Sequence, residues 1–390
     1  MKNMLMEVKS RNISCKCEKE VITGDDKAYV MKGSYSERAL DIYHLILAPS
    51  FQCNIRCRHC YLSNHNDQVI PKERVLRLID EWADIVVRER GEYGGIFHLK
   101  GGEPLLLPYL NDVIRRMGEH KSLQFMITTN GVMGSEEVVC RFGALNEKID
   151  GNVRVIVSLD GSNDSVNSVL RGTGNFDRTV QFIQMLRREG ITVYLNNVIH
   201  KKNIQDISSF IDLALSLDVQ QVNFLSFNPK GYGREIIGLQ VGACEVFKSI
   251  DKIWKVGNQR VKNLLKGSLS DVLFLEKCGR NTSQECVAGY KGLLYIVPDG
   301  TAYSCPNMDF SDLVFGNVMC SDLQSIHDSL ERKVYDKLLW LNGERADEPY
   351  SCKGVYYNSS LRNAFVMNEA VFDPKALDGD PISYCFSRNF

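Results

Sequence analysis

The stretch FQCNIRCRHCYL, residues 51–62, spaces Cys53, Cys57 and Cys60 as C-x3-C-x2-C. Cysteine thiolates bind soft metals, which in proteins means zinc or iron–sulfur clusters. A structural zinc ion takes four ligands, and His59 or His65 would supply the fourth here. A four-iron cluster held by three cysteines instead keeps one iron open, as a catalytic metal keeps a vacant position. The surrounding sequence must therefore decide between a zinc ion and a four-iron cluster with one open iron.

The cysteines follow the first of six apolar segments that alternate with longer amphipathic segments. The apolar segments, rich in Val, Ile and Phe as strands are, are His44–Pro49, Gly95–Leu99, Leu123–Thr128, Val153–Leu159, Thr192–Ile199 and Gln221–Phe227. Helices are expected over Pro71–Arg90, Leu105–Gly118, Ser135–Leu145, Asp177–Arg188 and Ile204–Leu217. Six strand–helix units predict parallel strands joined by right-handed crossovers. We therefore expect an α/β fold with a partial (β/α)6 TIM-type barrel, with a doubly wound sheet as the alternative.

The amino-acid composition and the lengths of the apolar runs argue against several classes of protein. The chain has 390 residues, of which 44% are hydrophobic and 24% charged, and its formal net charge is −1, so we expect no nucleic-acid partner. Its apolar runs are too short to cross a bilayer, and the N-terminal MKNMLMEVKSRN lacks the apolar core of a signal peptide. We therefore expect a cytoplasmic protein without a membrane partner. Disulfides rarely persist in that compartment, so the clustered cysteines among the thirteen indicate metal binding or catalysis.

The alternation of apolar and amphipathic segments ends after the sixth unit. Residues 236–277 have the pattern of a helical linker, and GLLYIVPDGTAYSCP, residues 292–306, predicts a β-hairpin that turns at Pro298-Asp299-Gly300. We expect residues 278–353 to form a small cysteine-rich hairpin domain, which a metal would stabilise because so small a unit buries little apolar surface. The other expected divisions are an N-terminal extension (1–43), the barrel (44–235) and a C-terminal tail (354–390).

Further motifs stand where the predicted strands end. LKGGEPLL follows the second strand, TTNG ends the third, and VSLDG ends the fourth, with Arg171 downstream of it. NFLSF, which contains Leu225, ends the sixth. Together with C-x3-C-x2-C and the aromatic Tyr61 that follows it, this order of motifs resembles the radical S-adenosylmethionine (SAM) superfamily. The resemblance covers roughly residues 44–235.

The resemblance implies a [4Fe–4S] cluster on the three cysteines, with SAM bound at its open iron. In the family the two glycines of the GGEP segment let the backbone approach the methionyl amino group, while Glu103 fixes the loop. Ser158 and Arg171 would hold the SAM carboxylate, whose planar shape suits a guanidinium, unless Arg171 is a surface charge. Leu225 would pack on adenine or belong to the core. The full expected cofactor-binding set is Tyr61, Gly101, Gly102, Glu103, Pro104, Asn130, Ser158, Asp160, Arg171 and Leu225.

A second resemblance covers the C-terminal cysteines. Cys286, Gly300 and Cys305 fit C-x13-G-x4-C, which resembles the SPASM and twitch domains that follow many radical SAM barrels and hold auxiliary clusters. Unlike in a full SPASM domain, no C-x2-C follows residue 60, so we expect one auxiliary [4Fe–4S] cluster, with a zinc staple as the alternative. Its expected ligands are Cys278, Cys286, Cys305 and Cys352, with Cys320 and Cys385 as rivals for the fourth place.

The resemblance also implies an enzyme. In this superfamily the cluster donates one electron to SAM, and the 5′-deoxyadenosyl radical that results takes a hydrogen atom from a substrate. Relatives with SPASM or twitch domains most often modify peptides. We therefore expect a maturase of ribosomally made peptide natural products that forms a crosslink or thioether or epimerises a residue. The alternatives are a small-molecule dehydrogenase, a sulfatase-maturase-like enzyme and, in a different class, a non-catalytic zinc or iron–sulfur protein.

The expected partners follow from that chemistry. They are a peptide substrate, a flavodoxin- or ferredoxin-type electron donor and a separate peptide-recognition protein. No catalytic acid or base is identified, although Tyr303 and Asp309 stand near Cys305 in the sequence.

Overall fold

The computed structural model describes residues 43–63, 65–91, 94–227, 230–241, 243–265, 293–303, 306 and 314–329. Several predictions lie outside this part of the chain: the N-terminal extension, the C-terminal tail, Asp309, and the cysteines 278, 286, 305, 352 and 385. The division of the chain into domains therefore stays a prediction. Among the described residues, no helix is long and apolar enough to cross a membrane.

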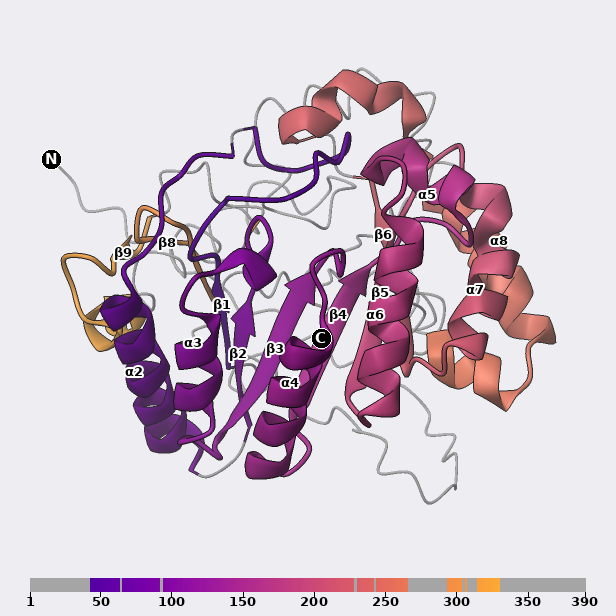
Figure 1. Ribbon diagram of the computed structural model, residues 1–390. Helices are drawn as coiled ribbons and strands as arrows, with labels where there is room; N and C mark the ends of the chain where they lie inside the picture. The colour runs from indigo at the N-terminus through magenta and orange to yellow at the C-terminus, as the bar shows by residue number, and fades with distance from the viewer. Residues whose placement is uncertain are drawn as a thin grey trace, which may run out of the picture.

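A single nine-stranded sheet runs through the described part of the chain, in the order β6-β5-β4-β3-β2-β1-β7-β8-β9 (Figure 1). Neighbours from β6 to β7 pair in parallel, whereas β8 pairs antiparallel to β7 and β9. The order from β6 to β1 has no reversal, which excludes the doubly wound alternative. The predicted parallel α/β sheet is confirmed. The strands are β1 (His44–Leu47), β2 (Gly95–Leu99), β3 (Leu123–Thr129), β4 (Val153–Ser158), β5 (Thr192–Ile199), β6 (Gln221–Ser226), β7 (Leu293–Ile296), β8 (Thr301–Tyr303) and β9 (Gly316–Asn317).

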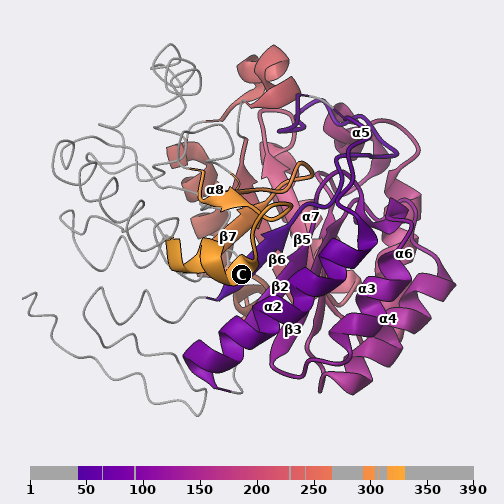
Figure 2. The same ribbon diagram turned by 90° about the vertical axis from the view of Figure 1, so that its left-hand side faces the viewer.

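Helices connect the parallel strands, and α2, α3, α4 and α6 lie on one side of the sheet (Figures 1 and 2). They are α2 (Lys72–Arg90), α3 (Leu110–Met117), α4 (Glu136–Lys148), α5 (Asp164–Arg171), α6 (Phe176–Arg188), α7 (Ile207–Ser216) and α8 (Ala243–Val256), with 3-10 turns η1 (Pro104–Leu106), η2 (Ile204–Asp206) and η3 (Gly231–Leu239). The helix expected from Leu105 begins only at Leu110, because η1 precedes it. The sequence analysis did not predict α5, which begins where the Asn163 side chain accepts a hydrogen bond from the Val166 amide and ends before Gly172.

The two faces of the sheet differ in chemistry because side chains alternate along each strand. One face is apolar and packs into the main core beneath the helices, as Phe97, Leu99, Phe125 and Ile127 do. The opposite face carries His98 on β2, Ser158 on β4, and asparagines on β5 and β6. A polar inner face at the ends of parallel strands is where barrel enzymes place their sites.

The predicted hairpin extends the barrel sheet. Strand β7 lies beside β1, with His44 opposite Leu293 and Leu47 opposite Ile296. The sequence predicts this hairpin in a separate small domain, whereas its described strands continue the sheet of the barrel. The reason is that β1 would otherwise be an open edge, and the apolar β7 covers it.

A buried arginine ties α2 to the segment that follows β9. The Arg74 guanidinium donates to the backbone oxygens of Val318 and Ser321, at 2.5 and 3.1 Å, and to both carboxylate oxygens of Glu81. Glu81 in turn accepts the amide of Leu323 at 3.0 Å. The pair thus joins residues that lie more than 240 positions apart in the chain.

Replacing Arg74 by alanine should therefore loosen this junction. We expect a loss of about 2–3 kcal/mol in the free energy of unfolding in urea, because charge-assisted hydrogen bonds are lost. We also expect faster hydrogen exchange in residues 318–323. Arg77, exposed on the same helix, provides the matched control as Arg77→Ala. Equal effects of the two substitutions would show that the junction contributes nothing specific.

Candidate active site

A loop after β1 carries the three cysteines over the carboxyl ends of the barrel strands. Cys53, Cys57 and Cys60 are half-buried and line one cavity. The other described lining residues come from this loop, from the strand ends and from α5: Ile55, His59, Tyr61, His65, Lys100, Gly101, Gly102, Thr128, Thr129, Asn130, Ser158, Arg171, Asn196, Val198, Leu225 and Pro306. The motifs that are scattered in the sequence thus meet in one place.

The environment of the sulfurs combines burial with a few polar contacts. Asn130 Nδ2 lies 3.8 Å from Cys53 Sγ, and an Arg171 guanidinium nitrogen lies 3.9 Å from Cys57 Sγ. Burial raises the pKa of the Cys57 thiol to about 12 and also raises the pKa values of Cys53 and Cys60. A coordinated metal deprotonates such thiols outright. The chain therefore presents three sulfurs whose anionic form depends on a bound metal.

The arrangement fits a cluster better than a single zinc ion. In the part of the chain that the structure describes, no three His, Cys, Asp or Glu side chains are placed to hold one metal ion. The two histidines considered as zinc ligands have other contacts: His59 Nε2 lies 3.6 Å from Asp160, and His65 Nδ1 lies 3.0 Å from the Phe51 oxygen. Three sulfurs that line one cavity without forming a site for one ion suit a cluster whose cysteines bind different irons.

The glycine pair after β2 seats the cysteine loop. Gly101 has a φ of +142°, and a Cβ there would lie 2.3 Å from the Ser50 oxygen. A Cβ on Gly102 would lie 2.0 Å from the Gln52 oxygen. The resemblance implied that these glycines admit the cofactor, and both do line the cavity. The structure adds a second reason, because the backbone of the loop occupies the space of their missing side chains.

Glu103 fixes the end of β2 to the end of β3. Its side chain is 4% exposed and accepts hydrogen bonds from the Thr129 hydroxyl at 2.6 Å and from the amides of Asn130 and Leu105 at 2.7 and 2.9 Å. Burial raises the pKa of Glu103, and these hydrogen bonds oppose the increase. Glu103 and Pro104 lie in a small adjacent pocket and are not among the residues that line the main cavity.

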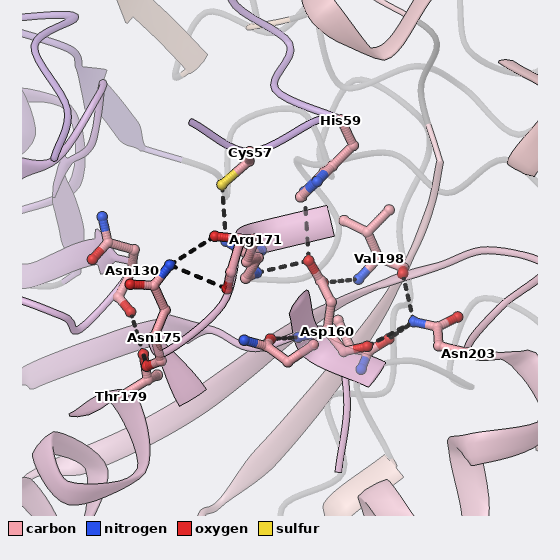
Figure 3. Close-up of polar contacts among 12 residues, drawn as sticks. Cys57, His59, Asn130, Asp160, Arg171, Asn175, Thr179, Val198 and Asn203 are labelled. Carbon is pink, nitrogen blue, oxygen red and sulfur yellow. Dashed lines mark hydrogen bonds and ion pairs between the residues drawn. The ribbon is translucent and has the colours of Figure 1, made fainter. Parts of the chain in front are cut away.

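Asp160 is the centre of a buried polar network (Figure 3). Its carboxylate forms an ion pair with Arg171 Nε at 2.7 Å and accepts the Val198 amide at 2.7 Å. It is also the group that His59 approaches, and its backbone oxygen accepts a hydrogen bond from Asn203 at 2.9 Å. Asp160 is 0% exposed and does not line the cavity. It therefore lies behind the cavity wall, although the sequence analysis placed it among the cofactor-binding residues.

Arg171 lies at the wall, at the end of α5. Asp160 holds its Nε from behind, while a terminal guanidinium nitrogen faces Cys57 (Figure 3). Arg171 is buried and lines the cavity, so it is not the surface charge considered as the alternative. Ser158, Asn130 and Tyr61 line the same cavity.

Leu225 belongs both to the cavity wall and to a small apolar cluster with Leu170, Val198 and Phe227. Its packing on adenine stays a prediction.

The segment after β6 closes over the cysteine loop. The amide of Gly233 donates to the Cys60 oxygen at 3.4 Å, and the amide of Tyr232 donates to the Leu62 oxygen at 3.3 Å. The Tyr232 ring stacks on His65 with the ring centres 5.8 Å apart. The cysteine loop is thus held by the glycine pair after β2 on one side and by the segment after β6 on the other.

Sequence reasoning missed several lining residues, among them Lys100, Thr128, Asn196 and Val198. Their signal was available: Lys100 directly precedes the glycine pair, and Asn196 and Val198 alternate on a strand, as inward-facing residues do. Of the rivals for the auxiliary site, Cys320 is described and exposed. Tyr303 lies on β8 and is half-buried.

Comparisons with known proteins agree with this geometry. A family model described as the Radical SAM superfamily matches residues 47–214. The chain is 30% identical over 187 residues to the AdoMet-dependent heme synthase of Methanosarcina barkeri, covering 47% of this chain and 50% of that protein. It is 27% identical over 273 residues to the mycofactocin maturase MftC of Mycobacterium tuberculosis, covering 69% of this chain and 66% of that protein.

A solved structure shares the fold. The crystal structure of Streptococcus suis SuiB bound to the precursor peptide SuiA superposes with a TM-score of 0.59 at 17% identity, covering 77% of this chain and 68% of that chain. The chain thus spans half of the heme synthase that it matches and about two thirds of the maturase. The segment matched by the family contains the three cysteines, the glycine pair and Arg171. Residues 47–214 thus match the radical SAM superfamily, the family that the order of motifs resembles.

Proposed function

We propose that this protein is a radical SAM enzyme that reductively cleaves SAM and abstracts hydrogen from a peptide. The observation that carries the proposal is the single cavity that brings together the three thiols of the cysteine loop, the backbone after β2 and the guanidinium of Arg171. These are the groups that an open-cornered cluster and an amino-acid-bearing cofactor need. A cluster bound to Cys53, Cys57 and Cys60 would supply one-electron reduction of SAM and so the 5′-deoxyadenosyl radical.

The chain's own part is to bind and orient the cofactor. Gly101 and Gly102 line the cavity, and their missing side chains leave room for the backbone of the cysteine loop. Arg171 offers its terminal nitrogens to a carboxylate, and Ser158, at the end of β4, offers a hydroxyl on the same wall. Asp160 is a positioning residue: it fixes the Arg171 side chain before the cofactor arrives.

The nucleoside end of SAM would meet a different surface. Leu225 and Val198 form an apolar patch at the ends of β6 and β5, which suits the face of a purine. Asn196, beside Ser158 in the sheet register, adds an amide to this wall. Tyr61 and the cysteines close the cavity on the loop side.

A peptide is the proposed substrate class. SuiB was solved with a precursor peptide, and MftC is a maturase; this chain resembles both over most of its length. The heme synthase relative keeps a small-molecule substrate as the second candidate. The proposal includes one auxiliary [4Fe–4S] cluster on Cys278, Cys286, Cys305 and Cys352, an external flavodoxin- or ferredoxin-type donor, and a cytoplasmic location.

Replacing Cys53, Cys57 and Cys60 together by alanine should remove the cluster that reduces SAM. We expect no 5′-deoxyadenosine after reduction with dithionite, and a loss of about four irons per chain. Iron of the auxiliary cluster should persist. Cys140→Ala, an exposed cysteine on α4, is the control and should keep both properties. Undiminished 5′-deoxyadenosine from the triple variant would contradict the assignment.

Replacing Arg171 by alanine should weaken SAM binding. The lost charge-assisted contact is worth about 1.5–3 kcal/mol, which corresponds to roughly a ten- to hundredfold increase in the dissociation constant. Lysine should restore only part of the affinity because it lacks the planar fork. Arg178→Ala, an exposed arginine on α6, serves as the control for equilibrium binding to the reconstituted protein. An unchanged dissociation constant in Arg171→Ala would remove this residue from the cofactor site.

The substitution Asp160→Asn tests the positioning role. It keeps the size of the side chain but removes the charge that holds Arg171, so SAM affinity should fall by roughly tenfold while the three-cysteine cluster is retained. Iron content and SAM binding are measured on the same sample, with Asp177→Asn, exposed on α6, as the control. Loss of the cluster together with SAM binding would instead indicate that Asp160 only supports the fold.

A further inference from the structure

The cysteine loop has an inner face and an outer face. Alternate residues of its first part line the cavity: Cys53, Ile55, Cys57 and His59. The residues between them, Asn54, Arg56 and Arg58, are exposed and are not among the residues that line the cavity. The loop therefore turns its thiols inward and two arginines outward, and a single thickness of chain separates the two faces.

The two arginines have no acidic partner in the part of the chain that the structure describes. Arg56 Nη1 donates to the backbone oxygens of Cys53 and Ile55, at 2.7 and 3.0 Å. Arg58 Nη1 donates to the Val169 oxygen at 3.3 Å. A guanidinium has five N–H donors, so these contacts brace the loop and still leave most of each guanidinium available to a partner molecule.

Arg58 is held in place at the end of α5. Its amide donates to the Leu170 oxygen at 2.8 Å, in addition to the side-chain contact with the preceding residue of the helix. The chain after α5 continues as Gly172, Thr173 and Gly174, which are exposed and have short side chains. No bulky side chain of this segment therefore keeps another protein from approaching the arginine.

The charge of the outer face acts on the sulfurs of the inner face. Burial raises the pKa of the Cys53 and Cys60 thiols, and the charge of Arg56 is among the effects that oppose this increase at both sulfurs. The whole chain has a formal net charge of −1, so the positive charge of the loop is a local feature and not part of a generally basic surface.

The proposed chemistry needs an electron from outside the protein at this position. Each reductive cleavage of SAM consumes one electron, which an external carrier has to deliver to the cluster. The rate of electron transfer falls steeply with distance, so the carrier has to approach closely. The outer face of the cysteine loop meets this requirement, because Cys57 stands between Arg56 and Arg58 in the sequence.

From these observations we propose that Arg56 and Arg58 form the docking surface for an acidic one-electron carrier protein. The carrier presents carboxylates around its redox centre to the two guanidiniums and delivers its electron through the cysteine loop. One electron leaves the carrier, which is oxidised, and reduces the cluster; no bond forms and no proton moves. The inference rests on the proposed function and deepens it, since it names the surface at which the external donor binds.

The test measures association of the reconstituted holoenzyme with oxidised flavodoxin and with oxidised [2Fe–2S] ferredoxin by titration calorimetry. The oxidised carriers report binding without turnover. We expect at least one carrier to bind, and its dissociation constant to rise between about 0.01 and 0.15 M salt, because the screening length falls from about 30 Å to about 8 Å. The carrier that shows this behaviour identifies the class of donor.

Charge reversal then assigns the binding to the two arginines. The double substitution Arg56→Glu/Arg58→Glu should raise the dissociation constant at low salt by roughly tenfold or more, because like charges then face one another. Arg56→Lys/Arg58→Lys keeps both charges and should retain most of the affinity. Arg188→Glu is the control: this exposed arginine ends α6, shortly before β5 begins, so it lies at the opposite end of the barrel.

Two further measurements on the same samples separate docking from folding. Iron content reports whether the loop still holds its cluster, and 5′-deoxyadenosine formed with excess dithionite should stay near the wild-type level, because so small a reductant needs no docking surface. The single substitution Arg58→Glu keeps the test decisive if the double variant loses iron, since the contacts of Arg56 with the loop remain.

Two results would overturn the docking surface. One is an unchanged dissociation constant in a charge-reversed variant that keeps its iron. The other is oxidation of flavodoxin hydroquinone by the Cys53, Cys57 and Cys60 triple variant at the wild-type rate, because the electron would then enter at the auxiliary cluster. Failure of the proposed function is seen separately, as the absence of 5′-deoxyadenosine when the wild-type holoenzyme is reduced with dithionite.

Discussion

The buried carboxylate of Asp160 is the interaction on which the arrangement of the site depends. It contacts Arg171 on α5, the amide of Val198 on β5 and, more distantly, His59 in the cysteine loop. Taking a carboxylate out of water costs several kcal/mol, which only well-placed charges and N–H groups offset. These partners come from three separate segments of the chain, so the carboxylate is tolerated only once the barrel, α5 and the loop are assembled. The position of the cavity's guanidinium is therefore fixed by the fold and not by a surface rotamer.

One face of this parallel sheet carries polar side chains, although both faces of a parallel sheet are normally apolar. Strands buried on both faces usually read as continuous hydrophobic runs. Here the face away from the helices carries histidine, threonine and asparagine, and these groups satisfy one another: His98 meets Thr128, and Asn196 accepts a hydrogen bond from Asn223 at 2.9 Å. Such pairing satisfies these buried groups and keeps the inner face polar. The stability of the fold comes from the outer face, so the inner face is available for recognition.

Much of this architecture follows from local sequence. The six strands were predicted from composition and from their spacing, and the motifs at their ends located the cavity because parallel strands bring their carboxyl ends to one edge. Three features could not be predicted from the sequence. The eight-residue α5 is too short for a clear period, the parallel pairing of β7 with β1 is a non-local choice that no local pattern encodes, and the exposure of motif residues depends on tertiary contacts. Asp160 and Glu103 carry motif signals as strong as that of Ser158, yet both lie behind the wall.

The charge state of the three cysteine sulfurs couples the cysteine loop to the groups that surround the cavity. Burial disfavours the thiolate form of Cys53, Cys57 and Cys60, and one amide and one guanidinium shared with Asp160 do not reverse this. A coordinated cluster does reverse it, since metal binding makes thiolates of the sulfurs. The cations on the described walls then face negative charge at short range in a medium that screens it weakly. The cysteine loop thus depends on the cluster for its anionic sulfurs, and we expect binding of the cluster and ordering of the cysteine loop to be one process.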